Sequence, residues 1–319
     1  MTTIARSTPP TPSAPPRPAK SSTARRQPFA LTMPAIAVIA FTFLFPAVYN
    51  VILAFQKLSP YESPGDAVWV GLSNFTAIFT AQQTTQAAWN TAFWLTTVTV
   101  AIRLVLGMGL ALLLQSKVVA RWKLRGVCRT AVLVPWMIPP VVAVACWKWM
   151  LDANTGVLNQ VLVGLGIVPR GVAFLADTST VWWSVIAIVV WRELPFVVIV
   201  LMAGLQSIPQ DQYEAASLDE AGSWKSFLHV TLPNLRPVLA VVISLTVIQT
   251  FNNFVYVWLS TGGGPGTYTQ VLATQLYSAA FIGNNRGQGA AIGILLSLVM
   301  AVFALVYFRL SNRNDRGRA

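Results

Sequence analysis

The chain has 319 residues, of which 55% are hydrophobic and only 10% are charged, and its mean hydropathy is +0.60. Soluble globular domains carry about 25% charged residues, so this composition excludes an ordinary soluble protein and indicates a polytopic membrane protein. The formal charge of +12 does not indicate a nucleic-acid-binding domain, because the basic residues are spread between apolar segments.

The N-terminal segment precedes any apolar run. Residues 1–28 are rich in Pro, Ser, Thr and Ala and contain five basic residues and no acidic one. Such a segment cannot bury a core, so a disordered cytoplasmic tail is expected. The apolar run that follows, residues 29–55, exceeds the roughly 7–15 residues of a signal-peptide core and is predicted to be the first membrane helix.

Five further apolar runs approach the roughly 20 residues that cross about 30 Å of hydrocarbon. They cover residues 89–115, 127–150, 181–205, 237–260 and 288–308. The third predicted helix contains Pro135, Pro139 and Pro140, which should kink or break it because proline lacks a backbone donor. The sequence therefore predicts an all-α integral membrane protein, with six transmembrane helices over residues 29–310 and a C-terminal tail over 311–319.

The distribution of Lys and Arg predicts the orientation. Sixteen basic residues lie at the termini and after the second and fourth predicted helices, against three in the other connections. By the positive-inside rule both termini are expected in the cytoplasm, and the chain in the bacterial plasma or inner membrane. The sixteen are Arg6, Arg17, Lys20, Arg25, Arg26, Lys117, Arg121, Lys123, Arg125, Arg129, Lys225, Arg236, Arg309, Arg313, Arg316 and Arg318, and the three are Lys57, Arg170 and Arg286.

A long polar segment interrupts two apolar runs. Residues 207–233 hold four of the ten acidic residues of the chain. Ser207 and Gln210 have the spacing of a capping box, which predicts a short helix that begins at Ser207, and Ser223 can begin a second one after Gly222. Two short helices at the cytoplasmic side could form a docking platform for a partner or rest on lipid, and the pattern alone leaves both interpretations open.

Within this segment a Glu-Ala-Ala triplet is followed, after thirteen intervening residues, by a Val, one residue and Leu-Pro. The residues are Glu214, Ala215, Ala216, Val230, Leu232 and Pro233. This spacing resembles the EAA motif of permease subunits of binding-protein-dependent ABC importers, which reads EAA, three residues, Gly, nine residues, Ile, one residue, Leu-Pro, so that Val230 stands in place of the isoleucine. The glycine position is occupied by Glu220, which puts in doubt a close packing or bend there, although Gly222 can supply the turn.

Other segments, in order along the chain, resemble the carbohydrate permeases of the maltose and glycerol-phosphate type. They are WVGLSNFTAIF at 69–79, NTAFW at 90–94, AGLQSIP at 203–209 and STGGGPGTYT at 260–269. The resemblance implies a type I ABC importer permease fold whose cytoplasmic coupling helices contact an ATPase. The residues that it implies in coupling are Glu214, Ala215, Ala216, Asp219, Gly222, Leu232 and Pro233.

The resemblance also implies the partners. They are a second homologous permease subunit, two ATPase subunits, an extracytoplasmic lipid-anchored solute-binding protein, membrane lipid and a sugar. The chain has no G-x-x-x-x-G-K-[ST] motif, so ATP and Mg are expected on the ATPase subunits. This chain itself is expected to be no enzyme and to hold no cofactor, metal or nucleic acid.

Charged residues within the apolar runs are candidates for a substrate path. Arg103 lies about 14 residues into its predicted helix, and both a structural ion pair and a role in the path are open for it. Arg192 and Glu193 are adjacent and point to different helix faces, so a mutual ion pair is not assured. Lys148 lies between two tryptophans near a helix end and is expected to reach the interface.

The stretch QTFNNFVYVW at 249–258 adds the polar and aromatic groups that sugar sites use. Asn252 and Tyr256 are four residues apart and would share a helix face, which makes them the first candidates for sugar binding, with Gln249 and Asn253 beside them. The alternative is that these side chains hold helices together.

Two other functions compete with an ATP-driven sugar importer. A membrane enzyme such as a lipid-linked glycosyltransferase needs paired acids or a metal cluster, and the acids of the outer loops, Glu62, Asp66, Asp152 and Asp177, are scattered. A secondary transporter predicts inverted repeats and buried carboxylates, for which only Glu193 qualifies. The expected solute is a di- or oligosaccharide, with trehalose favoured because the first permease subunits of actinobacterial trehalose importers look similar.

Overall fold

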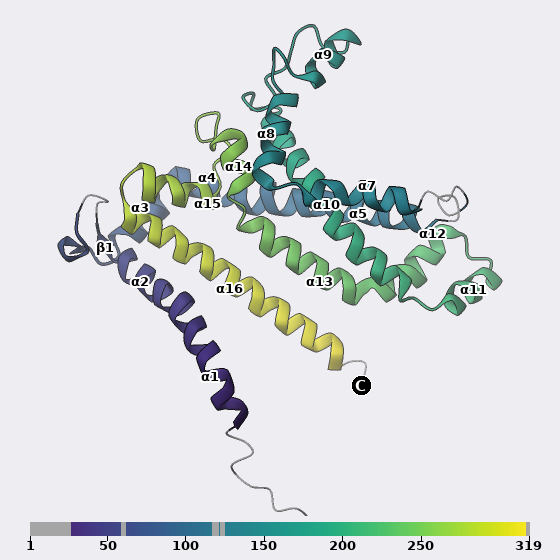
Figure 1. Cartoon of the computed structure of the whole chain (residues 1–319), viewed down its shortest axis with the longest axis horizontal. Coiled ribbons are helices and arrows are strands. Elements are labelled where there is room, and N and C mark those ends of the chain that lie inside the picture. The colour runs from purple at the N-terminus through teal and green to yellow at the C-terminus, as the bar shows by residue number, and fades with distance from the viewer. Residues whose placement is uncertain (1–26, 59–61, 117–120, 122–124, 317–319) are drawn as a thin grey trace, which may run out of the picture. The chain divides into compact units, whose positions relative to one another are not determined.

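The computed structural model describes residues 27–58, 62–116, 121 and 125–316 (Figure 1). The predicted tail over 1–28 falls almost wholly outside these residues. The chain divides after Tyr49 into two compact units. In the first unit, α1 (Gln27–Ile39) and the π-helical turn η2 (Ala40–Leu44) lead into α2 (Phe45–Ala54), and Thr32–Ala54 is long and apolar enough to cross a membrane.

The second unit, from Asn50 on, holds the other helices. Its first half contains β1 (Gln56–Lys57), η3 (Pro64–Asp66), β2 (Val68–Trp69), α3 (Ser73–Thr80), α4 (Gln82–Trp89), η4 (Asn90–Val98), α5 (Thr99–Gln115), α7 (Arg125–Met137), α8 (Pro140–Met150) and α9 (Val157–Gly164). Its second half contains α10 (Val181–Gln206), α11 (Gln210–Leu218), α12 (Ser223–Ser226), η5 (Phe227–Thr231), α13 (Leu232–Phe251), α14 (Val255–Thr261), α15 (Leu272–Tyr277), η6 (Ser278–Ile282) and α16 (Arg286–Arg316).

The helical fold agrees with the sequence prediction. Five helices of the described chain are long and apolar enough to cross a membrane, and α7 with α8 makes a sixth if that bent pair counts as one span. The strands β1 and β2 form a small antiparallel ribbon in the described residues. Helix α16 runs to Arg316, so the predicted tail over 311–319 begins as part of a helix.

Two of the predicted membrane helices are interrupted. Helices α7 and α8 meet at an angle of 98°, which confirms the break expected from the prolines. Pro139 and Pro140 have no N–H group, so α7 cannot continue, and Pro140 instead occupies the first turn of α8. The predicted helix over 237–260 is wrong as one element, because α13 ends at Phe251 and α14 begins at Val255.

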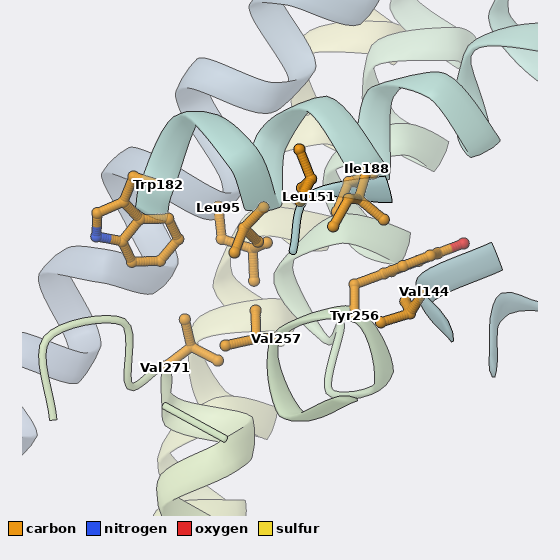
Figure 2. Packing of buried hydrophobic residues seen from close by; sticks show 10 residues of the cluster. Leu95, Val144, Leu151, Trp182, Ile188, Tyr256, Val257 and Val271 are labelled. Carbon is orange, nitrogen blue, oxygen red and sulfur yellow. The ribbon is translucent and has the colours of Figure 1, made fainter. Parts of the chain in front are cut away.

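Helix α10 is the centre of the packing. Its residues Val185, Ile188 and Val189 are buried together with residues of η4, α8 and α14, and Figure 2 shows part of this cluster around Leu95 and Tyr256. Glycines bring neighbouring helices close to α10, since a Cβ on Gly107 of α5 would lie 2.6 Å from the Val197 side chain. This close approach fixes the positions of the charged residues that α5 and α10 carry.

Candidate functional site

A cavity of about 470 Å³ lies where the two helix breaks meet. Its walls come from α5, α7, α8, α10, α13 and α14, together with the connection between α13 and α14. All the residues predicted for a substrate path line this one cavity, and their role in transport stays a prediction. They are Arg103, Arg192, Glu193, Gln249, Asn252, Asn253 and Tyr256.

Glu193 contacts three other polar side chains of the cavity. Its Oε1 accepts hydrogen bonds from Arg192 Nη1 at 2.7 Å and from the Tyr256 hydroxyl at 2.6 Å. Its Oε2 lies 3.9 Å from Arg103 Nη2. The doubt about a mutual Arg192–Glu193 pair is thus corrected, because the long arginine side chain reaches its neighbour from the adjacent helix face.

Arg103 joins three helices. Its side chain is 1% exposed, and its guanidinium donates to Thr250 Oγ1 of α13 at 3.1 Å and to the Glu193 carbonyl of α10 at 3.2 Å. Such a deep arginine is tolerated only when paired, which the acid and these two acceptors provide. Arg103 therefore makes a structural ion pair and also lines the cavity.

Helix breaks supply backbone groups to the cavity region. Arg192 Nε donates at 3.3 Å to the carbonyl of Ile138, which lies in the bend between α7 and α8. Inside an unbroken helix this carbonyl would accept a bond from the backbone four residues on. Because the helix is broken, the Ile138 carbonyl is free to accept a hydrogen bond from the Arg192 side chain, which lines the cavity.

Asn252 and Tyr256 do not share one helix face, contrary to prediction. Asn252 caps the end of α13, while Tyr256 belongs to α14 and is 2% exposed. Between them, the Asn253 side chain accepts a hydrogen bond from the Tyr256 N–H at 3.2 Å, while Phe254 directly precedes α14 and gives it no side-chain cap. The two side chains reach the same cavity from separate elements.

Several cavity residues were missed from the sequence. The Thr250 hydroxyl accepts a hydrogen bond from Arg103. Trp136 and Phe196 add aromatic faces whose ring centroids are 6.5 Å apart. The available signal for Trp136 was its place just before the Pro139–Pro140 break, since a broken membrane helix often lines a site.

The polar segment over 207–233 folds into the two predicted short helices, α11 and α12, followed by η5. The predicted capping box is wrong. Ser207 ends α10 and its hydroxyl donates to the Gly204 carbonyl at 2.8 Å, while Pro209 precedes α11 without a side-chain cap. The Ser207 hydroxyl thus bonds to a carbonyl that the end of α10 leaves free, and it does not cap α11.

Glu220 itself makes the turn that ends α11. Its φ is +54°, in the left-handed region. The Ala221 N–H bonds to the Ala216 carbonyl and the Glu220 N–H to the Ser217 carbonyl, which is the Schellman pattern with Glu220 at the position that glycine favours. The expectation that Gly222 supplies the turn is wrong, because Gly222 is extended and precedes α12.

Glu220→Gly should therefore stabilise the segment by about 1 kcal/mol, because glycine adopts the left-handed conformation without steric cost. Hydrogen exchange of the α11 amides should slow about fivefold in the purified protein. Glu220→Ala is the matched control, since it removes the charge but keeps a Cβ. Equal slowing in both variants would show that the charge and not the backbone conformation is responsible.

The segment is braced and presents an exposed face. The Tyr213 hydroxyl lies 3.0 Å from Thr231 Oγ1, and Asn234 Nδ2 donates to Gln212 Oε1 at 2.7 Å, so α11 is tied to η5 and α13. Of the residues implied in coupling, Glu214, Ala215, Asp219 and Gly222 are exposed, and Ala216, Leu232 and Pro233 are half-buried. The side chains of Leu218 and Trp224 are 86% and 70% exposed, which is unusual for large apolar groups.

The part of the chain that holds the cavity and the braced segment is similar to known transport proteins. Residues 103–318, about two thirds of the chain, match the model of the family described as "Binding-protein-dependent transport system inner membrane component". The chain belongs to this family. It is a multi-pass inner membrane protein and a permease subunit of an ABC transporter, in which a separate subunit hydrolyses ATP.

Named relatives cover most of the chain. It is 34% identical over 249 residues to the trehalose/maltose transport system permease protein MalF of Thermococcus litoralis, covering 76% of this chain and 79% of the relative. It is 33% identical over 290 residues to the arabinooligosaccharides transport system permease protein AraP of Bacillus subtilis, covering 89% and 88%. A solved bacterial ABC transporter involved in the import of the acidic polysaccharide alginate has a chain with a TM-score of 0.74 and 25% identity, covering 91% of this chain and 96% of that one.

Two segments singled out in the sequence of this permease meet in its structure. Asn90 Nδ2 donates to the carbonyls of Tyr268 and Gln270, each at 2.8 Å, and Thr91 Oγ1 accepts from the Leu272 N–H. The start of the second membrane helix thereby holds the glycine-rich loop after α14. These polar residues have a structural explanation.

Two acids of the loops predicted to face outside, Asp152 and Asp177, also have local partners. Asp152 accepts bonds from the backbone N–H groups of Thr155 and Asn154, and Asp177 from the side chain and backbone of Ser179, which holds the pKa of both carboxyls below the usual range. Within the described residues no group of three or more His, Cys, Asp or Glu could hold a metal ion. The arrangement offers no observation in favour of a membrane glycosyltransferase.

Proposed function

We propose that this permease subunit carries a di- or oligosaccharide into the cytoplasm, with trehalose the favoured solute. The observation that carries the proposal is the cavity, in which amides, a charged cluster and aromatic faces meet at two helix breaks. Two relatives named for trehalose/maltose and for arabinooligosaccharides support a saccharide as the solute.

The chemistry of the cavity suits hydroxyl groups. Gln249 and Asn252 offer amides that both donate and accept, and Trp136 and Phe254 offer flat apolar faces on which a sugar ring can stack. Glu193 is already bonded by Arg192 and Tyr256, so these three present a fixed pattern of donors and acceptors. A fixed pattern reduces the conformational entropy that binding must overcome.

We propose the orientation from the charge distribution, and the partners from the family to which the chain belongs. With both termini and residues 207–233 in the cytoplasm, α11 and α12 face an ATPase subunit, and the glycine-rich loop after α14 faces an extracytoplasmic solute-binding protein. A second permease subunit, two ATPase subunits that bind ATP and Mg, and a lipid-anchored binding protein complete the importer. Short braced helices can convert the movement of an ATPase into rotation of membrane helices.

The test is uptake of labelled trehalose and maltose by proteoliposomes that contain the whole complex and its binding protein. Uptake that requires ATP on the side of residues 207–233 supports both the function and the orientation. Labelling of a cysteine placed at Glu214 and at Asn154 with an impermeant reagent gives the orientation separately. The proposal fails if no saccharide enters while the assembled complex hydrolyses ATP.

Asn252→Ala should raise the half-saturating sugar concentration for uptake about five- to tenfold, with the maximal rate unchanged, because one amide hydrogen bond to the sugar is lost. Asn252 is exposed and its one described side-chain bond goes to the Ile248 carbonyl at 3.2 Å, so the fold should tolerate the change. Asn154→Ala in an outer loop is the matched control. An unchanged half-saturation in Asn252→Ala would remove this residue from the substrate path.

A further inference from the structure

A second pocket lies apart from the central cavity and shares none of its lining residues. Its volume is about 260 Å³, and it lies between α3, α4, α15, η6 and α16. Every side chain that lines it is uncharged, and the remaining lining residues are alanine and isoleucine. The polar lining residues are Gln83, Thr84, Gln270, Gln275, Ser278 and Gln288.

Two glutamines in this pocket have buried acceptor atoms without a partner in the described part of the chain. Gln275 Nε2 donates to Thr84 Oγ1 at 2.8 Å, while its Oε1 is buried and unpaired. Gln270 Oε1 is buried and unpaired as well. Turning the Gln275 amide over would leave its N–H group unpaired instead. Because an unsatisfied buried polar atom is costly, these groups call for a hydrogen-bonding occupant.

The pocket is formed before any occupant arrives. The Gln270 carbonyl accepts the bond from Asn90 that also holds the glycine-rich loop. The backbone N–H of Gln275 bonds to the Val271 carbonyl at 2.8 Å, and that of Gln288 to Asn285 Oδ1 at 3.1 Å. The glutamines thus project from separate elements that are each fixed by other contacts.

We propose that this pocket binds one uncharged polyhydroxylated ring, a single sugar unit of the transported solute. Amides donate and accept, as hydroxyl groups do, whereas an ion would need a counter-charge that the lining does not offer. The volume is far above the roughly 10–15 Å³ that one water requires and just below the roughly 300 Å³ at which pockets for drug-sized ligands begin, a size that admits one ring.

The location gives the pocket a place in transport. Figure 1 shows α3, α4 and α15 at the opposite end of the second unit from α11 and α12. This part of the inference rests on the proposed function, because the proposed orientation puts that end outside the cell. The pocket is then an outer subsite that holds one sugar unit after it leaves the binding protein and before it reaches the central cavity.

A protection experiment tests binding without transport. Ser278→Cys, in a full complex in nanodiscs with Cys128 and Cys146 replaced by serine, is treated with a small neutral thiol reagent. D-Glucose should slow modification at least about threefold, and D-glucuronate should not. Adding Gln270→Leu and Gln275→Leu should abolish the protection, whereas Gln82→Leu, an exposed glutamine of α4 outside the pocket, should leave it intact. If the leucine variants do not accumulate, Gln275→Asn withdraws the amide by one methylene and should also abolish protection.

Uptake separates this inference from the proposed function. With the native cysteines present, Gln275→Leu should raise the half-saturating sugar concentration about tenfold and leave the maximal rate within about twofold, since hydrogen bonds are lost in an early complex only. Normal uptake without glucose protection, or equal protection in the leucine variants, would overturn the subsite and leave water as its occupant. Protection without any sugar uptake would instead overturn the proposed function and keep the site.

Discussion

Glu214→Ala should abolish ATP-dependent uptake while the permease still accumulates in the membrane. Glu214 lies exposed on α11, and the groove beside it, of about 1020 Å³, runs along the polar segment. Loss of a central charged contact typically weakens an interface by about 2 kcal/mol or more, roughly a 30-fold loss of affinity. Co-purification of the ATPase subunit, measured beside uptake, should fall in parallel.

The control for this variant is Asp211→Ala in the same helix. Asp211 is also an exposed acid, and its carboxylate accepts a bond from the next backbone N–H at 2.9 Å, which is a local helix-start contact. It should therefore retain most uptake and ATPase association. If uptake and association both survive in Glu214→Ala, the segment over 207–233 has no coupling role at this residue, and resting on lipid becomes the better explanation for it.

Glu193→Gln should destabilise the permease by about 3 kcal/mol, because it leaves the buried Arg103 without its acid. The cluster of Arg103, Arg192 and Glu193 has a net charge of +1, and the variant raises it to +2 where water is scarce. Unfolding of the purified protein by denaturant in one detergent gives the measurement. Glu214→Gln on the exposed face of α11 is the surface control and should change stability by less than about 0.5 kcal/mol.

The double variant Arg103→Met and Glu193→Gln gives a sharper test. It restores the net charge to +1, so most of the lost stability should return even though two groups are altered. A double variant as unstable as Glu193→Gln would show that Glu193 stabilises through Arg192 and Tyr256 and not through Arg103.

The membrane segments and the cavity residues were predictable to different degrees. Hydropathy found the membrane helices, and Pro139 and Pro140 gave the first break, because both effects act locally. Charges and amides in apolar runs identified the cavity residues, since such groups are expensive in hydrocarbon and need a shared environment. That they meet in one cavity required the packing of α5, α10 and α13.

The wrong predictions have a common physical cause. The break after Phe251 contains neither proline nor glycine. Asn253 lies in it and its side chain accepts a bond from the Tyr256 N–H of α14, and the apolar residues on both sides conceal the break in the sequence. The Ser207 side chain could bond either to a backbone N–H at the start of α11 or to a carbonyl at the end of α10. It bonds to the Gly204 carbonyl of α10. In both places a short polar side chain bonds to one of several nearby backbone groups. Sequence spacing does not determine which backbone group that is.

The pairing of Arg103 has a consequence for how the chain is made. The arginine precedes Glu193 by 90 residues, so at about 5–20 residues per second it leaves the ribosome roughly 5 to 20 s before its acid exists. A lone arginine near the centre of a helix opposes insertion by about 2.5–3.5 kcal/mol. The other residues of Gln82–Gln115, a helix long and apolar enough to cross a membrane, must therefore carry the arginine into the bilayer unaided. Insertion thus depends on the leucines and valines around Arg103, which do not line the cavity.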